Sequence, residues 1–133
     1  MSWASPKIVS MLLESGAHPN ATDIGDRDVF MYAAFYGRTE NLKFWLQRFP
    51  DWDILRKESL VGSTALSLAI GFGPYNLRAI EFLLDNGAAI HGVLDSGLTM
   101  LMQSTWNEDS DVDVSKLLLK RMRLVWGVRN LIP

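Results

Sequence analysis

Apolar residues near the start of the chain recur with the spacing of a helix. An apolar stripe begins at Ile8 and continues one turn later at Leu12. Ser5 and Pro6 stand just before it, where a serine can cap free N–H groups and a proline suits the first helical turn. Gly16 follows the stripe and supplies the left-handed residue that commonly ends a helix. The pattern predicts a short helix with a defined start and end.

The same helix pattern returns later in the chain. Residues 8–23 resemble residues 79–94, and Gly16 in the first segment is matched by Gly87 in the second. A second motif, a turn followed by a short helix rich in small residues, occurs at residues 26–37, 62–73 and 97–106. Its equivalent points are Asp28, Thr64 and Thr99, spaced by 36 and 35 residues. Since one such unit cannot bury its apolar face alone, the units are expected to stack into an all-α solenoid.

The recurring residues match a known pattern most fully in one repeat. That repeat carries Gly62, Thr64, Leu66, Ala69, Gly73, Leu83, Leu84, Gly87 and Ala88. Fewer matches occur in the other copies, at Leu12, Leu13, Gly16, Ala17, Asn20, Ala21, Phe30, Ala33, Ala34, Gly37, Leu46, Gly97, Thr99, Leu101 and residues 117–119. With these residues the chain resembles the ankyrin repeat family, whose pattern is G-x-T-P-L-H-x-A-A-x-x-G, a helix ending in L-L, and G-A-D-V-N.

The resemblance implies one domain, residues 1–133, built as an ankyrin-type solenoid of about three and a half helix–loop–helix repeats. Its parts are a half-repeat (1–23), three repeats (24–58, 59–93 and 94–125) and a basic tail (116–133).

Departures from the family pattern predict a less regular stack. The family's proline is replaced by Val29, Ala65 and Met100, and its histidine by Met31, Ser67 and Met102. Because those family residues brace the first helix of each repeat, the brace is expected to be absent. Extra residues are expected within 49–59, near 74–75 and within 108–111.

Composition narrows the class of protein. Of the 133 residues, 48% are hydrophobic and 21% charged, which favours a folded domain. The chain has no cysteine and therefore neither a disulfide framework nor a thiolate zinc site. No apolar run approaches the roughly 18 residues of a membrane span, and no signal peptide pattern is present. We expect a soluble intracellular protein, cytoplasmic by default, with the nucleus or an organelle as alternatives.

Charge is unevenly distributed along the chain. Residues 1–115 carry all 15 acidic and 8 of the 13 basic side chains, whereas residues 116–133 carry only basic ones. The basic residues of this tail are Lys116, Lys120, Arg121, Arg123 and Arg129. Apolar residues between them predict a long final helix that caps the stack. The alternatives are docking on an acidic partner, on nucleic acid or on an anionic membrane.

No pattern in the chain indicates catalysis, a metal or a cofactor. His18 and His91 occupy loops in different repeats, so a solenoid would hold them far apart. The acidic residues within 108–113 lack the ligand spacing of a calcium loop. Residues 71–74 lack the Lys-Ser/Thr of a phosphate loop. With no nucleophile and base arrangement either, we expect neither an enzyme nor a small-molecule substrate.

Candidate binding residues follow from the resemblance, which implies contacts through the turn tips and the exposed side of each first helix. The residues at these places are Ile24, Arg27, Phe35, Tyr36, Leu60, Val61, Phe72, Leu98, Trp106 and Asn107. The four aromatic ones among them are expected to form one concave wall that meets a partner. In the alternative they fill gaps between irregular repeats. Trp45 and Trp52 are interpreted as packing residues.

The first helix predicts a second contact. Ile8, Val9 and Met11 place apolar residues on more than one of its sides. We expect its outer side to be covered by another subunit, another copy of the chain, or additional sequence.

Taken together, these features predict a non-catalytic protein–protein interaction module that serves as an adaptor or an accessory subunit of a complex. One alternative is a structural spacer of a longer ankyrin solenoid. The other is a basic-tailed accessory protein of nucleic acid or a membrane surface.

Overall fold

A computed structural model describes residues 5–72, 77–105 and 112–130. Its side chains are described except those of residue 72 and residues 124–130. Within these ranges the chain forms seven helices: α1 (Pro6–Glu14), α2 (Val29–Phe35), α3 (Thr39–Arg48), α4 (Ala65–Phe72), α5 (Leu77–Asp85), α6 (Met100–Ser104) and α7 (Val112–Asn130). The described residues contain no named strand, only an isolated bridge between Val93 and Thr99. The expected all-α architecture is confirmed.

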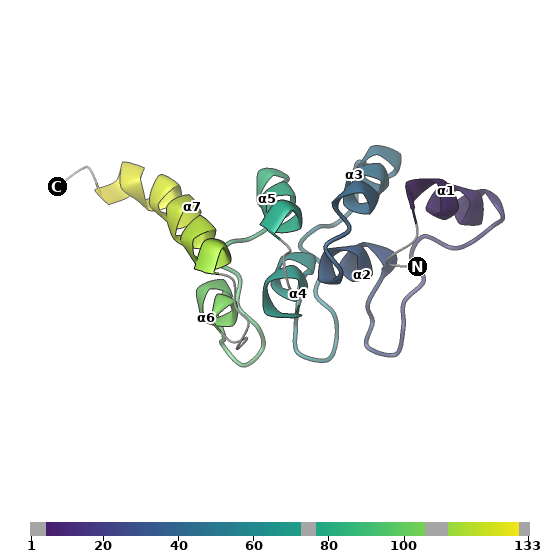
Figure 1. The fold of residues 1–133 in the computed structure, drawn as a ribbon. Coiled ribbons are helices and arrows are strands. Elements are labelled where there is room, and N and C mark those ends of the chain that lie inside the picture. The colour runs from purple at the N-terminus through teal and green to yellow at the C-terminus, as the bar shows by residue number, and fades with distance from the viewer. Residues whose placement is uncertain (1–4, 73–76, 106–111, 131–133) are drawn as a thin grey trace.

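The helices lie in two layers that run along the stack. Figure 1 shows α1, α3, α5 and α7 in one layer and α2, α4 and α6 in the other. Helix α2 packs on α4 and α4 on α6, while α2/α3, α4/α5 and α6/α7 form the helix pairs. Three long loops project from the α2/α4/α6 side, so the turn tips lie at one edge of the molecule (Figure 1).

Small residues allow the inner helices to approach one another. Ala33 and Ala34 of α2 and Ala65 and Ala69 of α4 are all buried in the core. Larger core residues come from both layers, for example Phe30 of α2 and Leu83 of α5. Burial of such side chains against neighbouring repeats is the main source of stability in a stack of this kind.

The first helix of each repeat is hydrogen-bonded at its start by a short side chain. In α4, the Ser67 N–H donates to Thr64 Oγ1 at 3.3 Å, and the Thr64 N–H donates to Ser67 Oγ at 2.8 Å. The Asp28 carboxylate and the Thr99 hydroxyl likewise accept from a backbone N–H one turn into α2 and α6. Short side chains therefore cap all three helices. In α4 the residue at the family's histidine position, Ser67, also takes part.

The segment after α3 is attached to the outer layer by aromatic rings. Trp45 is buried, and its ring centroid lies 4.7 Å from that of Phe49 and 5.3 Å from that of Trp52, the latter in an edge-on arrangement. Edge-on aromatic pairs are favourable beyond their burial alone. Both tryptophans are packing residues, as predicted.

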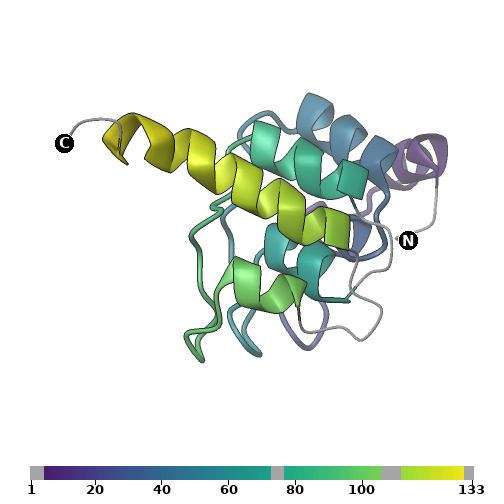
Figure 2. The ribbon, with the colours of Figure 1, turned by 60° about the vertical axis from the view of Figure 1, so that its left-hand side comes forward.

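Helix α7 closes one end of the stack. Val114 and Leu118 are buried in the common core, and Arg121 Nη2 lies 2.6 Å from Asp85 Oδ1 of α5. Beyond this contact the C-terminal part of α7 extends past the ends of the other helices (Figure 2). Among the described residues, no helix is both long and apolar enough to cross a membrane.

The opposite end exposes apolar side chains of α1. Val9 is buried, whereas Ile8 and Met11 are 48% and 57% exposed. The apolar residues of α1 therefore face both the stack and the outside, the distribution that its sequence predicted.

Candidate binding face

The three turn tips are short hairpins, and in each the N–H of the first residue donates to the carbonyl oxygen of the last. In tip 1 (23–27), the Asp23 N–H donates to Arg27 O at 3.0 Å. In tip 2 (58–63), the Glu58 N–H donates to Ser63 O at 2.8 Å. In tip 3 (94–98), the Leu94 N–H donates to Leu98 O at 3.0 Å. Tip 2 thus contains one more residue than the other two. Each tip includes a left-handed residue, which is Asp26, Gly62 or Gly97.

Backbone hydrogen bonds also join each tip to the next. The Ser59 N–H of tip 2 donates to Gly25 O of tip 1 at 3.1 Å. The Asp95 N–H of tip 3 donates to Val61 O of tip 2 at 2.9 Å. Because these bonds restrain the three tips relative to one another, their exposed side chains form one ordered surface.

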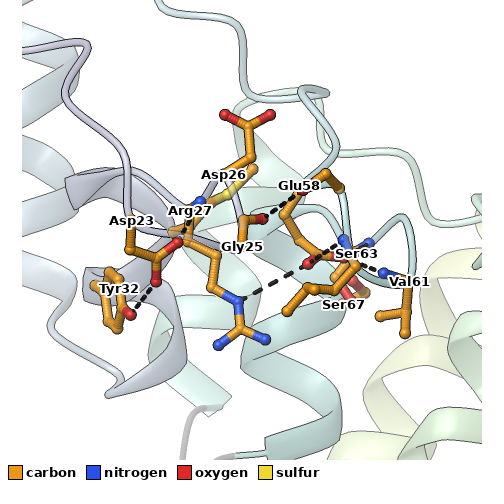
Figure 3. Close-up of polar contacts among 12 residues, drawn as sticks. Asp23, Gly25, Asp26, Arg27, Tyr32, Glu58, Val61, Ser63 and Ser67 are labelled. Carbon is orange, nitrogen blue, oxygen red and sulfur yellow. Dashed lines mark hydrogen bonds and ion pairs between the residues drawn. The ribbon is translucent and has the colours of Figure 1, made fainter.

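The junction between tips 1 and 2 contains a network of polar contacts (Figure 3). Its centre is the buried Glu58 carboxylate, which accepts hydrogen bonds from the backbone N–H groups of Leu60, Val61 and Ser63 at 3.0, 2.8 and 2.8 Å. Arg27 Nε of tip 1 lies 3.9 Å from Glu58 Oε2. Burial alone would raise the pKa of Glu58, but these donors and the Arg27 charge together hold it below its ordinary value.

A second carboxylate orders tip 1 from within. Asp23 Oδ1 accepts from the Arg27 N–H at 2.9 Å, and the Tyr32 hydroxyl of α2 donates to the same carboxylate (Figure 3). The hydrogen bond from Tyr32, followed by that from the Arg27 N–H, lowers the pKa of Asp23. The same hydrogen bond to Asp23 raises the pKa of Tyr32. Tip 1 is therefore anchored to the first helix of its own repeat.

Arg56 anchors tip 1 to the long segment that follows α3. Its guanidinium donates to Asp28 Oδ2 at 3.0 Å and to Asp26 O and Oδ1 at 2.7 Å each. Burial raises the pKa of Asp28, and the Met31 N–H and Arg56 oppose that shift only in part. Arg56 thus provides a positive charge that stabilises the ionised form of the buried Asp28 carboxylate.

The junction between tips 2 and 3 is apolar and open. At this junction Ser63 occupies the position that corresponds to Arg27, and Leu94 the one that corresponds to Glu58. These two residues cannot form an ion pair like that of Arg27 and Glu58. A groove of about 800 Å³ lies at this junction. Its lining residues are Leu60, Val61, Gly71, Leu94, Asp95, Ser96, Gly97, Leu98, Met102 and Gln103. Leu60 is 60% and Met102 53% exposed, although both are apolar.

The structure brings together part of the predicted binding set. Leu60, Val61 and Leu98 line the groove, and Ile24 is fully exposed on tip 1. Arg27 is engaged in the ion pair with Glu58.

The predicted aromatic wall is only partly described. The rings of Phe35 and Tyr36 meet edge-on, with centroids 4.7 Å apart, and Tyr36 is exposed. The Phe72 side chain, Trp106 and Asn107 lie outside the described residues.

Sequence reasoning missed Leu94, Met102 and Gln103 as groove residues. The available signal was an interruption of the repeat: tips 1 and 2 begin their hairpins with the carboxylates Asp23 and Glu58, whereas tip 3 begins with Leu94.

The histidines form no metal site in the described part of the chain. His18 is exposed, and its Nδ1 accepts the Asn20 N–H at 3.2 Å. His91 is exposed as well. No group of three or more His, Cys, Asp or Glu side chains within the described ranges could hold a metal ion.

Comparison with known proteins agrees with this architecture. A family model described as ankyrin repeats in three copies matches residues 30–125. No curated protein matches the chain. Ankyrin repeats are generally protein–protein interaction modules and are typically not catalytic. The matched region covers well over half of the chain and holds the helices from α2 to most of α7, so the chain belongs to the ankyrin repeat family.

Proposed function

We propose that this chain is a non-catalytic protein-binding module, an adaptor or accessory subunit that holds a partner protein on its tip edge. The observation that carries the proposal is the exposure of apolar side chains on an ordered surface. Ile24, Leu60 and Met102 are exposed on or beside tips joined by backbone hydrogen bonds. A clustered apolar surface is characteristic of a protein interface. Restraint of the tips before binding reduces the entropy lost on association.

The predicted tip and inner-helix residues are proposed to contact the same partner. Tyr36 extends the surface onto the end of α2, and Leu98 contributes from tip 3. Phe72, Trp106 and Asn107 remain part of the proposal on the strength of their positions in the repeat.

The exposed side of α1 supports a further protein contact at the other end of the stack. Ile8 and Met11 leave apolar area uncovered there. A neighbouring helix pair, from another subunit or a second copy, would bury that area as one repeat buries the face of the next.

Capture experiments test the proposal. The tagged full chain is used to isolate bound proteins from cells that express it, and mass spectrometry identifies them. Leu60→Asp is expected to weaken binding of the captured protein by about 2 kcal/mol, roughly 30-fold. Leu119→Asp is the matched control, because Leu119 is a similarly exposed leucine on α7 in the opposite layer. Equal loss in both variants, or full retention in Leu60→Asp, would contradict binding at the tip edge.

A further inference from the structure

The two junctions between tips differ in one respect that affects binding. Arg27 forms an ion pair across the first junction with Glu58. The Glu58 carboxylate also accepts backbone N–H groups of tip 2, such as that of Val61. At the second junction the equivalent positions hold Ser63, which is small and buried, and Leu94, which is apolar. Neither residue carries a charge. The first junction therefore pairs its opposite charges internally, whereas the second leaves a groove whose apolar walls have no covering group among the described residues.

The groove is shaped to admit a side chain. Leu60, Val61 and Met102 form exposed apolar walls, while Gly71 of α4 contributes no side chain. A Cβ at position 71 would lie 3.4 Å from Oε1 of Gln103, another lining residue, so any longer side chain there would begin inside the groove. A glycine within a helix costs about 0.5–1 kcal/mol relative to alanine. Its presence in α4 leaves the groove open.

The Asp95 carboxylate lies at the rim of the groove. The Asp95 N–H is bonded to Val61 O, and the carboxylate occupies the space that a Cβ on Gly62 would take. Within the part of the chain that the structure describes, no hydrogen bond or ion pair engages this carboxylate. Among the described residues that line the groove, Asp95 is the only charged one and no cation is present. An unpaired carboxylate beside apolar walls favours a cation on the incoming partner.

We propose that this groove binds a partner-protein segment that inserts one apolar side chain and places a neighbouring Lys or Arg against Asp95. This inference rests on the proposed protein-binding function and adds the chemistry of the partner. A nucleic acid fits poorly, because phosphate would meet a carboxylate and no cation in the groove. The charge on Asp95 thus selects the partner, and the apolar walls hold it.

A displayed library of random 12-residue peptides tests the proposal on the full chain. Peptides are selected on the wild-type protein and counter-selected on Gly71→Leu, which fills the groove. We expect the selected peptides to share an aliphatic or aromatic residue with Lys or Arg within three positions. Gly71→Leu should abolish their binding, whereas the matched control Gly71→Ala should retain it. Circular dichroism establishes that both variants are folded.

The role of Asp95 is tested separately with one selected peptide. Asp95→Asn should weaken its binding about three- to fivefold, the size of an exposed ion pair. Replacing the peptide's cation by Gln should cost the same factor, and the two changes together should cost no more than either alone. The inference would be overturned if the selected peptides showed no preference for Lys or Arg. It would also be overturned if Asp95→Asn bound the selected peptide as tightly as wild type. Failure to select any peptide that Gly71→Leu excludes would overturn it too.

The inference and the proposed function fail in different ways. If binding of the captured partner requires Leu60 and Ile24 but is unchanged in Gly71→Leu, the edge formed by the tips binds protein and the groove does not. If the wild-type chain self-associates and Gly71→Leu prevents it, a second copy fills the groove and the inference is wrong.

Discussion

Arg27 Nε lies 3.9 Å from Glu58 Oε2, and the two residues, 31 positions apart in the chain, meet across the junction of two repeats. The Glu58 side chain is fully buried and that of Arg27 is partly exposed. The same carboxylate accepts three backbone N–H groups of its own tip. One side chain therefore orders a turn and joins it to the neighbouring turn.

Replacing Glu58 should change how stability depends on pH. Because the pKa of Glu58 lies below its ordinary 4.5, the unfolded chain takes up its proton first as pH falls. The stabilisation is present above about pH 4.5 and is lost as pH falls through the pKa of the folded state. Glu58→Gln should therefore be less stable by about 1–3 kcal/mol at pH 7, with a smaller difference at pH 3.

Urea unfolding between pH 3 and 7 measures this effect. Comparison of the variant with wild type matters, because burial raises the pKa of Asp28 and gives it the opposite pH dependence. Glu40→Gln, exposed on α3, is the control. A difference between Glu58→Gln and wild type that stays constant with pH would contradict the prediction.

Arg56 should be required for the stability of tip 1. Arg56→Ala removes the cation beside the buried Asp28 carboxylate and three hydrogen bonds to tip 1 and the start of α2. We expect a loss of about 1–3 kcal/mol in the free energy of unfolding, measured by urea titration. Lys57→Ala, at the exposed neighbouring position, should change it by less than about 0.5 kcal/mol. Similar effects of the two variants would show that the Arg56 contacts contribute little.

Core and surface positions should separate folding from binding. Leu83→Ala removes a fully buried side chain of α5 and is expected to cost about 2–5 kcal/mol in unfolding free energy. Tyr36→Ala removes an exposed ring beside Phe35 and should alter stability by about 1 kcal/mol or less. Binding of the captured partner should be weakened by Tyr36→Ala at equal folded concentration. A Tyr36 variant as unstable as Leu83→Ala would favour the gap-filling interpretation of the aromatic residues.

Helix α1 should exchange its amide hydrogens faster than the interior of the stack. It has one fully buried side chain, Val9, whereas α5 buries Ala79, Ile80 and Leu83. Few buried contacts allow local opening at low free energy. Hydrogen exchange on the isolated chain should show residues 6–14 less protected than residues 77–85. Addition of a protein that covers Ile8 and Met11 should slow exchange in α1, and equal protection of both helices without it would contradict the prediction.

The sequence alone determined where the helices and tips lie. Apolar spacing, Pro6 and Gly16 specify local backbone conformation, and the recurrence of Asp28, Thr64 and Thr99 at 36 and 35 residues predicts the stacking units. The exposed tip positions Ile24, Leu60 and Val61 followed from the resemblance and are exposed in the structure. These features depend on residues close together in the chain, whose pattern can be read directly.

Only the tertiary structure decided which side chains meet across the repeats. The groove joins Leu60 and Gly71 to Met102, and the ion pair joins Arg27 to Glu58, through contacts between residues far apart in sequence. Those contacts depend on how neighbouring repeats stack on one another, which no periodic pattern specifies. At the second junction the positions that correspond to Arg27 and Glu58 hold Ser63 and Leu94, and an open apolar groove lies there in place of an ion pair.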